Sequence, residues 1–388
     1  MRKLIYFCPE SIASIAKNSI EQAKAIAAQG VDVDFLCPHD WPGEWPGGVR
    51  MHAVLNPGPK PGIYTRLISR LLGVRKIMGN NALLSDFINK ADTRGGQKPR
   101  VMFGSFFEYL APIWVPKLDR FRRTGVVFGA TALDPIRDHI VGPTWWHRAS
   151  VEQAYALFRE VFVHQAVDLA LSRPLPEQRV TEVPHGPYDY PAWPDARSAT
   201  RKELGLTEDA KVFLSFGHLR ENKNLALVLE ALREMPDNVF LLVVGPEAAP
   251  GRMSSGDYQE LARSLGVEHK VRWAIRYVSD EEVNKYFGAA DFSVMTYSRT
   301  FRSTSGALHI AAPLRMPVLV SCGQAPLGSL VTDYNLGVRV EPDSVSEIVR
   351  GMRLLLASPF SGGWDRFMAY FTYEENARIV IDKLFEDR

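Results

Sequence analysis

The order of apolar segments constrains the fold of this chain more than any other feature of its sequence. Lys3–Cys8 is a short apolar run that ends at Pro9, which predicts a buried strand. Ile15–Gln29 carries apolar residues at helical spacing and stops at Gly30, and Val31–Cys37 is strand-like again. Strand, helix and strand in this order predict a right-handed crossover between two parallel strands.

The alternation of predicted strands and helices continues along the chain and is interrupted once. In the first half we predict further strands at Val101–Gly104, Gly125–Ala130, Val161–His164 and Thr181–Val183. In the second half we predict strands at Val212–Phe216, Val239–Gly245, Val271–Ala274, Phe292–Thr296 and Pro317–Ser321, and helices at Leu225–Glu234, Tyr258–Leu265, Glu281–Ala289, Ser305–Leu314 and Val345–Ala357. Between the halves, the Pro-rich stretch 184–200 has little periodicity, and we interpret it as a linker. We therefore predict two doubly wound α/β domains, residues 1–190 and 191–368, with a ligand in the cleft between them, followed by a last helical segment, 369–388.

Composition and charge narrow the class of protein. A length of 388 residues suits two domains, and 46% hydrophobic and 23% charged residues are ordinary for a soluble globular protein. A net charge of +2 gives no reason to expect a nucleic-acid partner. Three scattered cysteines predict neither a disulfide framework nor a zinc site, and they fit a reducing cytoplasm. We find no signal peptide and no run of ~18 apolar residues, so we expect a cytoplasmic protein without a membrane-spanning helix.

A first candidate anion site follows the strand Val212–Phe216. The stretch FLSFGHLRENKNLALVLEAL places Gly217, His218, Arg220 and Lys223 between this strand and the next helix. Glycine lets a ligand approach the backbone closely, arginine presents a planar fork to phosphate oxygens, and lysine adds a point charge. Taken alone, the stretch is equally compatible with a solvated loop that carries two surface cations.

A second candidate site follows the strand Phe292–Thr296. Here YSRTFRSTSGALHIAAPLRMPV contains Arg299 and Arg302 and then a run of small polar residues, Ser303, Thr304, Ser305 and Gly306, at the predicted start of a helix. These residues can cap the helix, or they can offer hydroxyls and free amides to a phosphate. Because both sites follow strands of one predicted sheet, together they suit a diphosphate better than a single phosphate.

The same residues carry a family resemblance. The segments GHLRENKNLALVLEAL, FLLVVGP, YVSDEEVNKYFGAADFSVMTYS and SGALHIAAPLRMPVLVS resemble, in order and spacing, the C-terminal half of GT-B glycosyltransferases, most closely the retaining glycosyltransferase family 4. In the first half LDPIRDH, REVFVHQ and VPHGPYDY are more weakly similar to the central stretch of that group. The resemblance implies the GT-B fold, with two Rossmann-like domains, the active site in the interdomain cleft and a last helix that crosses back to the first domain.

The resemblance also implies a function and roles for residues. It implies a hexosyltransferase-like enzyme that takes a sugar from a nucleotide-diphosphate donor without a metal or other cofactor. Arg220 and Lys223 would hold the diphosphate, and Thr304, Ser305 and Gly306 would form the phosphate cradle. The same match implies that Gly217 lies near the transferred sugar and that Arg276 and Tyr277 contact the base.

The sequence departs from the family pattern at several positions. Two glutamates that normally hold the donor sugar and the ribose align with Arg302 and Ile310, and the family's first-domain histidine aligns with Leu133. The glycine-rich loop after the first strand is also absent. An active transferase could use His309 for the ribose and Arg302 for a phosphate or an acidic sugar. The alternative is a catalytically degenerate homologue that binds sugar nucleotides or a partner.

The first domain offers candidates for the acceptor. Asp134 and His139, in a polar cluster after a predicted strand, could orient an acceptor or donor sugar, although Asp-Pro is also a common turn opener. The basic amphipathic segment Tyr64–Gly79 could lie on an anionic membrane surface, or it could be an ordinary surface helix. The resemblance implies a glycan or lipid-linked acceptor, and surface polysaccharide or glycolipid synthesis at the inner face of the cell membrane.

Other enzyme classes find less support. A phosphorylase should show a pyridoxal-phosphate lysine, an epimerase a carboxylate-rich site, and a dehydrogenase the pattern Gly-x-Gly-x-x-Gly after a strand. The sequence shows none of these clearly.

Overall fold

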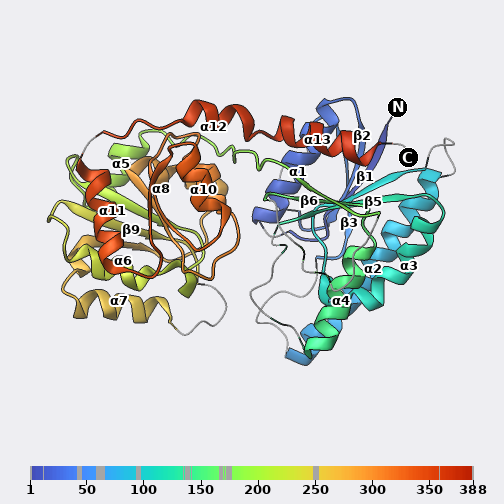
Figure 1. Cartoon of the computed structure of the whole chain (residues 1–388), viewed down its shortest axis with the longest axis horizontal. Helices are drawn as coiled ribbons and strands as arrows, with labels where there is room; N and C mark the ends of the chain where they lie inside the picture. The colour runs from blue at the N-terminus through green and yellow to red at the C-terminus, as the bar shows by residue number, and fades with distance from the viewer. Residues whose placement is uncertain are drawn as a thin grey trace. The chain divides into compact units, whose positions relative to one another are not determined.

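A computed structural model of the chain describes residues 2–11, 13–41, 46–57, 66–92, 98–133, 135, 140, 142–165, 169, 171, 177–247, 253–357 and 359–386. The chain divides into two compact units (Figure 1). The first unit contains Met1–Gly186 and Phe371–Arg388, and the second contains Pro187–Tyr370. Each unit is built on one parallel sheet, which confirms the predicted α/β class.

The first unit contains a seven-stranded sheet in the order β3-β2-β1-β4-β5-β6-β7. Its strands are β1 (Lys3–Phe7), β2 (Asp32–Pro38), β3 (Val49–Leu55), β4 (Arg100–Phe103), β5 (Val127–Ala132), β6 (Glu160–Val163) and β7 (Arg179–Glu182). Its helices are α1 (Ala13–Ala28), α2 (Arg66–Asp92), α3 (Ala111–Arg123), α4 (Thr144–Ala156) and α13 (Tyr373–Leu384), with a 3-10 turn, η1, at Glu108–Leu110. All its strand pairs are parallel, as the crossover pattern predicts.

Alternate side chains of the strands fill two cores on opposite faces of this sheet. On β1, Ile5 and Phe7 pack with residues of α2, α3 and α4, whereas Leu4 and Tyr6 pack with residues of α1 and α13. This alternation follows from the two-residue period of a strand. The last helix is therefore part of the core of the first unit.

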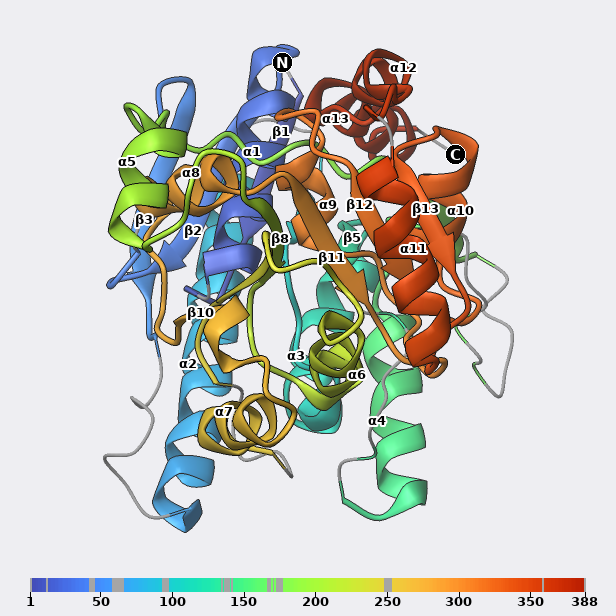
Figure 2. The ribbon, with the colours of Figure 1, turned by 90° about the vertical axis from the view of Figure 1, so that its left-hand side faces the viewer.

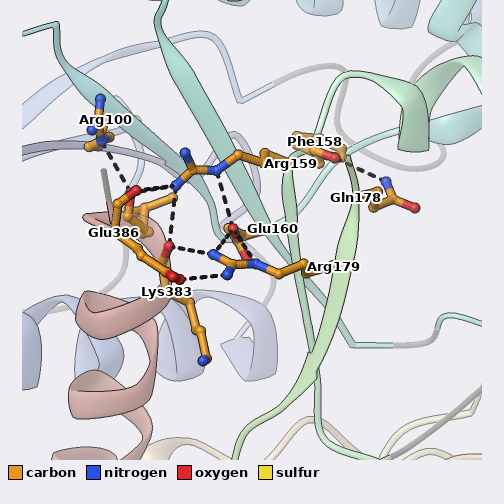
Figure 3. Close-up of polar contacts among 9 residues, drawn as sticks. Arg100, Phe158, Arg159, Glu160, Gln178, Arg179, Lys383 and Glu386 are labelled. Atoms are coloured by element: carbon orange, nitrogen blue, oxygen red, sulfur yellow. Dashed lines mark hydrogen bonds and ion pairs between the residues drawn. The ribbon is translucent and has the colours of Figure 1, made fainter. Parts of the chain in front are cut away.

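Three arginines bind the end of α13 to this sheet. Arg100, Arg159 and Arg179, at the starts of β4, β6 and β7, donate to the carbonyl oxygens of Lys383 and Leu384 at 3.1–3.2 Å (Figure 3). These carbonyls have no acceptor role inside the helix, and the cations also complement the negative end of the helix dipole. The carboxylate of Glu160, which is 0% exposed, receives Arg159 at 3.2 Å and Arg179 at 2.6 Å and offsets part of the positive charge of the cluster.

The second unit contains a six-stranded sheet in the order β10-β9-β8-β11-β12-β13. Its strands are β8 (Lys211–Phe216), β9 (Val239–Val244), β10 (Val271–Ala274), β11 (Phe292–Thr296), β12 (Val318–Ser321) and β13 (Gly337–Val340). Its helices are α5 (Ala196–Glu203), α6 (Leu225–Leu232), α7 (Ser255–Ser264), α8 (Asp280–Ala289), α9 (Gly306–Ala311), α10 (Pro326–Asp333), α11 (Val345–Ala357) and α12 (Trp364–Tyr370). Helices α6, α7 and α11 share one core with β8, β9 and β11 and lie on one side of the sheet (Figure 2).

The end of the predicted linker is helical instead. Helix α5 begins at Ala196, and its Arg201 is 0% exposed. The guanidinium of Arg201 donates to Asp291 at 2.8 Å and to the carbonyl oxygens of Ala289 and Ala210 at 3.0 Å. Because this anchor forms across about 90 residues of sequence, local pattern did not reveal the helix.

Candidate functional site

The predicted anion site lies at the point where the strand order of the second sheet reverses. From β8 the chain proceeds outward to β9 and β10, and then returns to β11 on the other side of β8. In doubly wound sheets, ligands bind outside the carboxyl ends of the strands at such a point. The loops that follow β8 and β11 begin at this point. They carry the residues of the two anion sites that the sequence predicted.

Two glycines bring the backbones together at this point. Gly217 has φ +92°, and Gly245, which follows β9, has φ +138°. A β-carbon on Gly245 would lie 2.4 Å from the carbonyl oxygen of Gly217. Both positions therefore require glycine, Gly217 by its dihedral and Gly245 by dihedral and contact together.

We expect Gly245→Ala to lower the free energy of unfolding of the second unit by about 3 kcal/mol, since the change adds a backbone clash to a strained dihedral. Gly205→Ala is the matched control, because Gly205 also has positive φ, +62°, but no atom lies within 4 Å of the added carbon. The control should cost about 1 kcal/mol. Urea denaturation measures both, and equal losses would contradict the importance of this close approach.

Arg220 and Lys223 provide positive charge that has no carboxylate partner in the part of the chain that the structure describes. Lys223 donates to the carbonyl oxygen of Phe216 at 2.6 Å, and its Nζ lies 3.2 Å from where a β-carbon on Gly217 would stand. Arg220 is exposed, and its side chain makes no hydrogen bond or ion pair with any residue that the structure describes. Arg220 immediately precedes a 3-10 turn, η2 (Glu221–Lys223), which ends with Lys223 and comes before α6. Two cations held at the end of a strand without a carboxylate partner among the described residues suit an anionic ligand.

The local environment changes the ionisation of two groups in this loop. Burial, together with the nearby charge of Arg220, lowers the pKa of Lys223 to about 7. Burial and the charges of Arg220 and Lys223 also lower the pKa of His218, so His218 is neutral at physiological pH. An anion bound here would restore the positive charge of Lys223.

Two hydrogen bonds connect the loop after β11 to the backbone of the loop after β8. The N–H of Ser298 donates to the carbonyl oxygen of Asn222 at 2.8 Å, and the hydroxyl of Thr296 donates to that of Lys223 at 3.1 Å. The charge of Arg220 also lowers the pKa of the buried Tyr297, although burial outweighs it and raises the value. The two loops that the sequence predicted separately thus lie together at the end of the sheet.

Within the second loop, Tyr297 positions the hydroxyl of the predicted cradle. Its ring stacks on Phe301 with 3.8 Å between centroids and 8° between planes, and its hydroxyl lies 3.0 Å from the hydroxyl of Ser305. Ser305 is buried and immediately precedes α9, whereas Gly306 is exposed at the first position of this helix. Ser303 and Thr304 are half-buried in the same loop. Their contact with phosphate stays a prediction.

Arg302 braces this loop through one of its terminal nitrogens. Its Nη1 donates to the carbonyl oxygens of Arg299 at 2.8 Å and Phe301 at 3.2 Å. Its Nε and Nη2 make no hydrogen bond with a described residue, and the side chain has no carboxylate partner in that part of the chain. Arg299, in contrast, lies 4.0 Å from Asp343.

The other predicted donor-site residues lie in different surroundings. His309 is 1% exposed, with its ring 5.8 Å from that of Phe367. Arg276 is paired with Glu282 and Tyr286, while the side chain of Tyr277 is 60% exposed. A ribose contact by His309 and base contacts by Arg276 and Tyr277 stay predictions. Asp134 and His139 lie outside the described residues.

Sequence reasoning missed two residues that shape this site. Tyr297 follows the predicted strand Phe292–Thr296 and was given no role, and only its stacking on Phe301 and its contact with Ser305 reveal one. Asn224 adopts the left-handed conformation, φ +53°, where the chain turns into α6, and its side chain donates to Asp343 at 2.9 Å. Asparagine tolerates this conformation better than most residues, so the signal was present in its identity.

Comparison with known proteins identifies the fold and the domain that carries this site. The family model for glycosyl transferases group 1 matches residues 196–371, which include both loops. Residues 196–371 form a group 1 glycosyl transferase domain.

A sucrose-phosphate synthase from Thermosynechococcus elongatus superposes with a TM-score of 0.68 at 16% identity, over 99% of this chain and 98% of that one. The Anabaena protein HepE, solved in complex with UDP and glucose, superposes with a TM-score of 0.65 at 14% identity, over 100% and 96%. The chain has the GT-B fold.

Proteins with similar sequences are also named as glycosyltransferases. The D-inositol 3-phosphate glycosyltransferase of Streptomyces coelicolor is 29% identical over 243 residues, which cover 60% of this chain and 50% of that protein. The protein of the same name from Geodermatophilus obscurus is 28% identical over 198 residues, 48% of this chain and 43% of that one. The chain thus matches about half the length, or less, of these curated relatives.

Proposed function

We propose that the protein transfers a sugar from a nucleoside-diphosphate donor to a glycan or lipid-linked acceptor. The observation that carries the proposal is the pair Arg220 and Lys223, whose charges have no carboxylate partner among the described residues and which lie at the switch point of a group 1 domain. The complexes of HepE with UDP and with UDP-glucose support a donor of this kind. The D-inositol 3-phosphate glycosyltransferases support a polar acceptor that carries hydroxyl groups.

The chemistry that this site can supply is stabilisation of a leaving diphosphate. As the bond between the sugar and the diphosphate breaks, negative charge grows on the phosphate oxygens. Fixed donors from Arg220, Lys223 and the hydroxyl of Ser305 would stabilise that charge as it forms. We propose transfer without a metal and with retention of configuration. Among the described residues, no group of three metal-ligating side chains gathers.

Turnover tests this proposal. Purified protein would be incubated with UDP-, GDP-, ADP- and TDP-sugars and a panel of glycan and glycolipid acceptors, and release of nucleoside diphosphate would be followed. We expect release from one nucleotide class that increases with acceptor. Binding without release from any donor would favour the second candidate, a sugar-nucleotide-binding subunit. Ile310 is buried at the position where the resemblance to family 4 implies a ribose-binding glutamate, which supports that candidate.

The pH dependence of donor binding follows from the position of Lys223. We expect binding of a nucleotide sugar to take up a proton above about pH 7, because the bound diphosphate favours the charged amine. Affinity should fall as pH rises through this range and be constant below it. Calorimetry in buffers of different ionisation enthalpy measures the uptake, and Lys223→Met should abolish it. An uptake that persists in this variant would contradict the assignment.

A membrane-bound acceptor would explain why one surface of the first unit exposes apolar and basic side chains together. On α2, Leu71 and Met78 are 62% and 41% exposed and share a face with the exposed Arg75. Lys76 is not available to that face, since it pairs with Glu10 at 3.0 Å. Within the described residues, no helix is long and apolar enough to span a bilayer.

We propose that this face rests on anionic lipid. In co-sedimentation, vesicles with anionic phospholipid should bind the protein about tenfold more strongly than neutral vesicles. The variant Leu71→Ser/Met78→Ser should reduce that binding. Equal binding to both kinds of vesicle would contradict the proposal.

A further inference from the structure

The site of the second unit contains more positive charge than a nucleotide sugar can neutralise. When a bound anion has restored the charge of Lys223, three cations have no carboxylate partner among the described residues, namely Arg220, Lys223 and Arg302. The other two arginines of the region are neutralised, Arg299 by Asp343 and Arg276 by Glu282. His218 is neutral because its pKa is lowered. A diphosphate that bridges a nucleoside and a sugar carries about two negative charges, which leaves one cation in excess.

The excess cation is a preorganised hydrogen-bond donor. Two carbonyl oxygens hold Nη1 of Arg302, so the plane of the guanidinium is fixed while Nε and Nη2 stay unused. Nη1 also lies 2.9 Å from where a β-carbon on Gly323 would stand, so the loop after β12 lies close to the bonded end of the group. A fixed guanidinium with two unused donors suits a carboxylate or phosphate, which can accept two parallel bonds.

The surroundings of Arg302 also limit which part of a ligand it can meet. Arg302 precedes the cradle residues Thr304, Ser305 and Gly306 in the same loop, so its charge acts beside the diphosphate that they would bind. The loop from Tyr297 to Gly306 contains no carboxylate, and carboxylates are the usual acceptors for sugar hydroxyls. A loop that offers a fixed guanidinium and no carboxylate favours a sugar with an anionic acceptor of its own.

We propose that the transferred sugar is acidic and that Arg302 binds its carboxylate. This inference rests on the proposed function, because it assumes a nucleotide-sugar donor at the same loops. It adds the chemical class of the sugar and assigns specificity to one residue.

Two donors that differ only at C6 test this inference. UDP-glucuronate and UDP-glucose would be titrated calorimetrically, with UDP alone as a reference, and GDP-mannuronate and GDP-mannose would serve in the same way if the protein prefers guanosine. We expect the acidic sugar to bind about tenfold or more tightly than the neutral one. Arg302→Gln should reduce this ratio to about one while the affinity for UDP changes little.

Arg299→Gln is the matched control. It removes an arginine from the same loop, but one whose charge Asp343 neutralises. It should preserve the preference for the acidic sugar.

The outcomes separate this inference from the proposed function. Equal affinity for acidic and neutral sugars, with tight binding of UDP, would overturn this inference alone. A uniform loss of all ligands in Arg302→Gln would show that Arg302 only braces the loop, and would overturn it as well. If no nucleotide binds in either series, the proposed function falls, and this inference falls with it.

Discussion

Replacing Arg220 with alanine is expected to lower the rate of sugar transfer by about 10²–10³-fold. The side chain of Arg220 has no hydrogen bond or ion pair with a described residue, so its removal should not disturb the fold. Its charge nevertheless acts on Lys223 and Tyr297, which places it beside both loops of the site. The loss should appear mainly in kcat, because charge on the diphosphate grows as the bond to the sugar breaks.

Two further variants make the Arg220 experiment specific. Arg220→Lys keeps the charge but loses the planar fork, and we expect it to recover only part of the activity. Arg233→Ala removes an exposed arginine just after α6, away from both loops, and should leave activity unchanged. A rate within about threefold of wild type for Arg220→Ala would contradict the assigned role.

Replacing Glu160 with glutamine is expected to lower the free energy of unfolding of the first unit by about 3–5 kcal/mol. Glu160 is fully buried, and it receives both Arg159 and Arg179, which also hold the last turn of α13 (Figure 3). Without the carboxylate, Arg159 loses its ion pair and Arg179 keeps the one with the exposed Glu386, while the helix end still depends on the position of both guanidinium groups. Urea denaturation followed by fluorescence measures the change.

Glu386→Gln is the control for this prediction. Glu386 pairs with Arg179 at 2.5 Å but is 45% exposed, so water replaces much of what the pair contributes. We expect a loss of about 0.5 kcal/mol or less. Similar losses in both variants would show that the buried carboxylate does not organise the cluster.

The sequence was informative about the parallel sheets because their strands are apolar runs that alternate with helical periodicity. Elements without that contrast were missed. Strand β3 contains an arginine and a histidine among its apolar residues, and α5 depends on the anchor that Arg201 forms across the fold. Strand β13 and helix α10 are short, so their pattern gave little signal.

The candidate site was predictable where function depends on residue type at a strand end. Glycine, arginine and lysine after β8, and small polar residues after β11, pointed to phosphate before any contact was known. The close approach of Gly245 to Gly217, the stacking of Tyr297 and the bracing by Arg302 were not predictable. They are contacts between segments far apart in sequence, or geometries within a loop that has no regular period.

Calorimetric titration of the protein with UDP, GDP, ADP and TDP tests the central claim most directly. The claim is that Arg220, Lys223 and the loop before α9 bind a diphosphate without the two glutamates that the family resemblance implies at Arg302 and Ile310. We expect one nucleotide to bind with a Kd in the micromolar range, on the order of −8 kcal/mol, and Lys223→Ala to weaken it by about tenfold or more. Absence of binding by all four nucleotides, or unchanged affinity in Lys223→Ala, would contradict the claim.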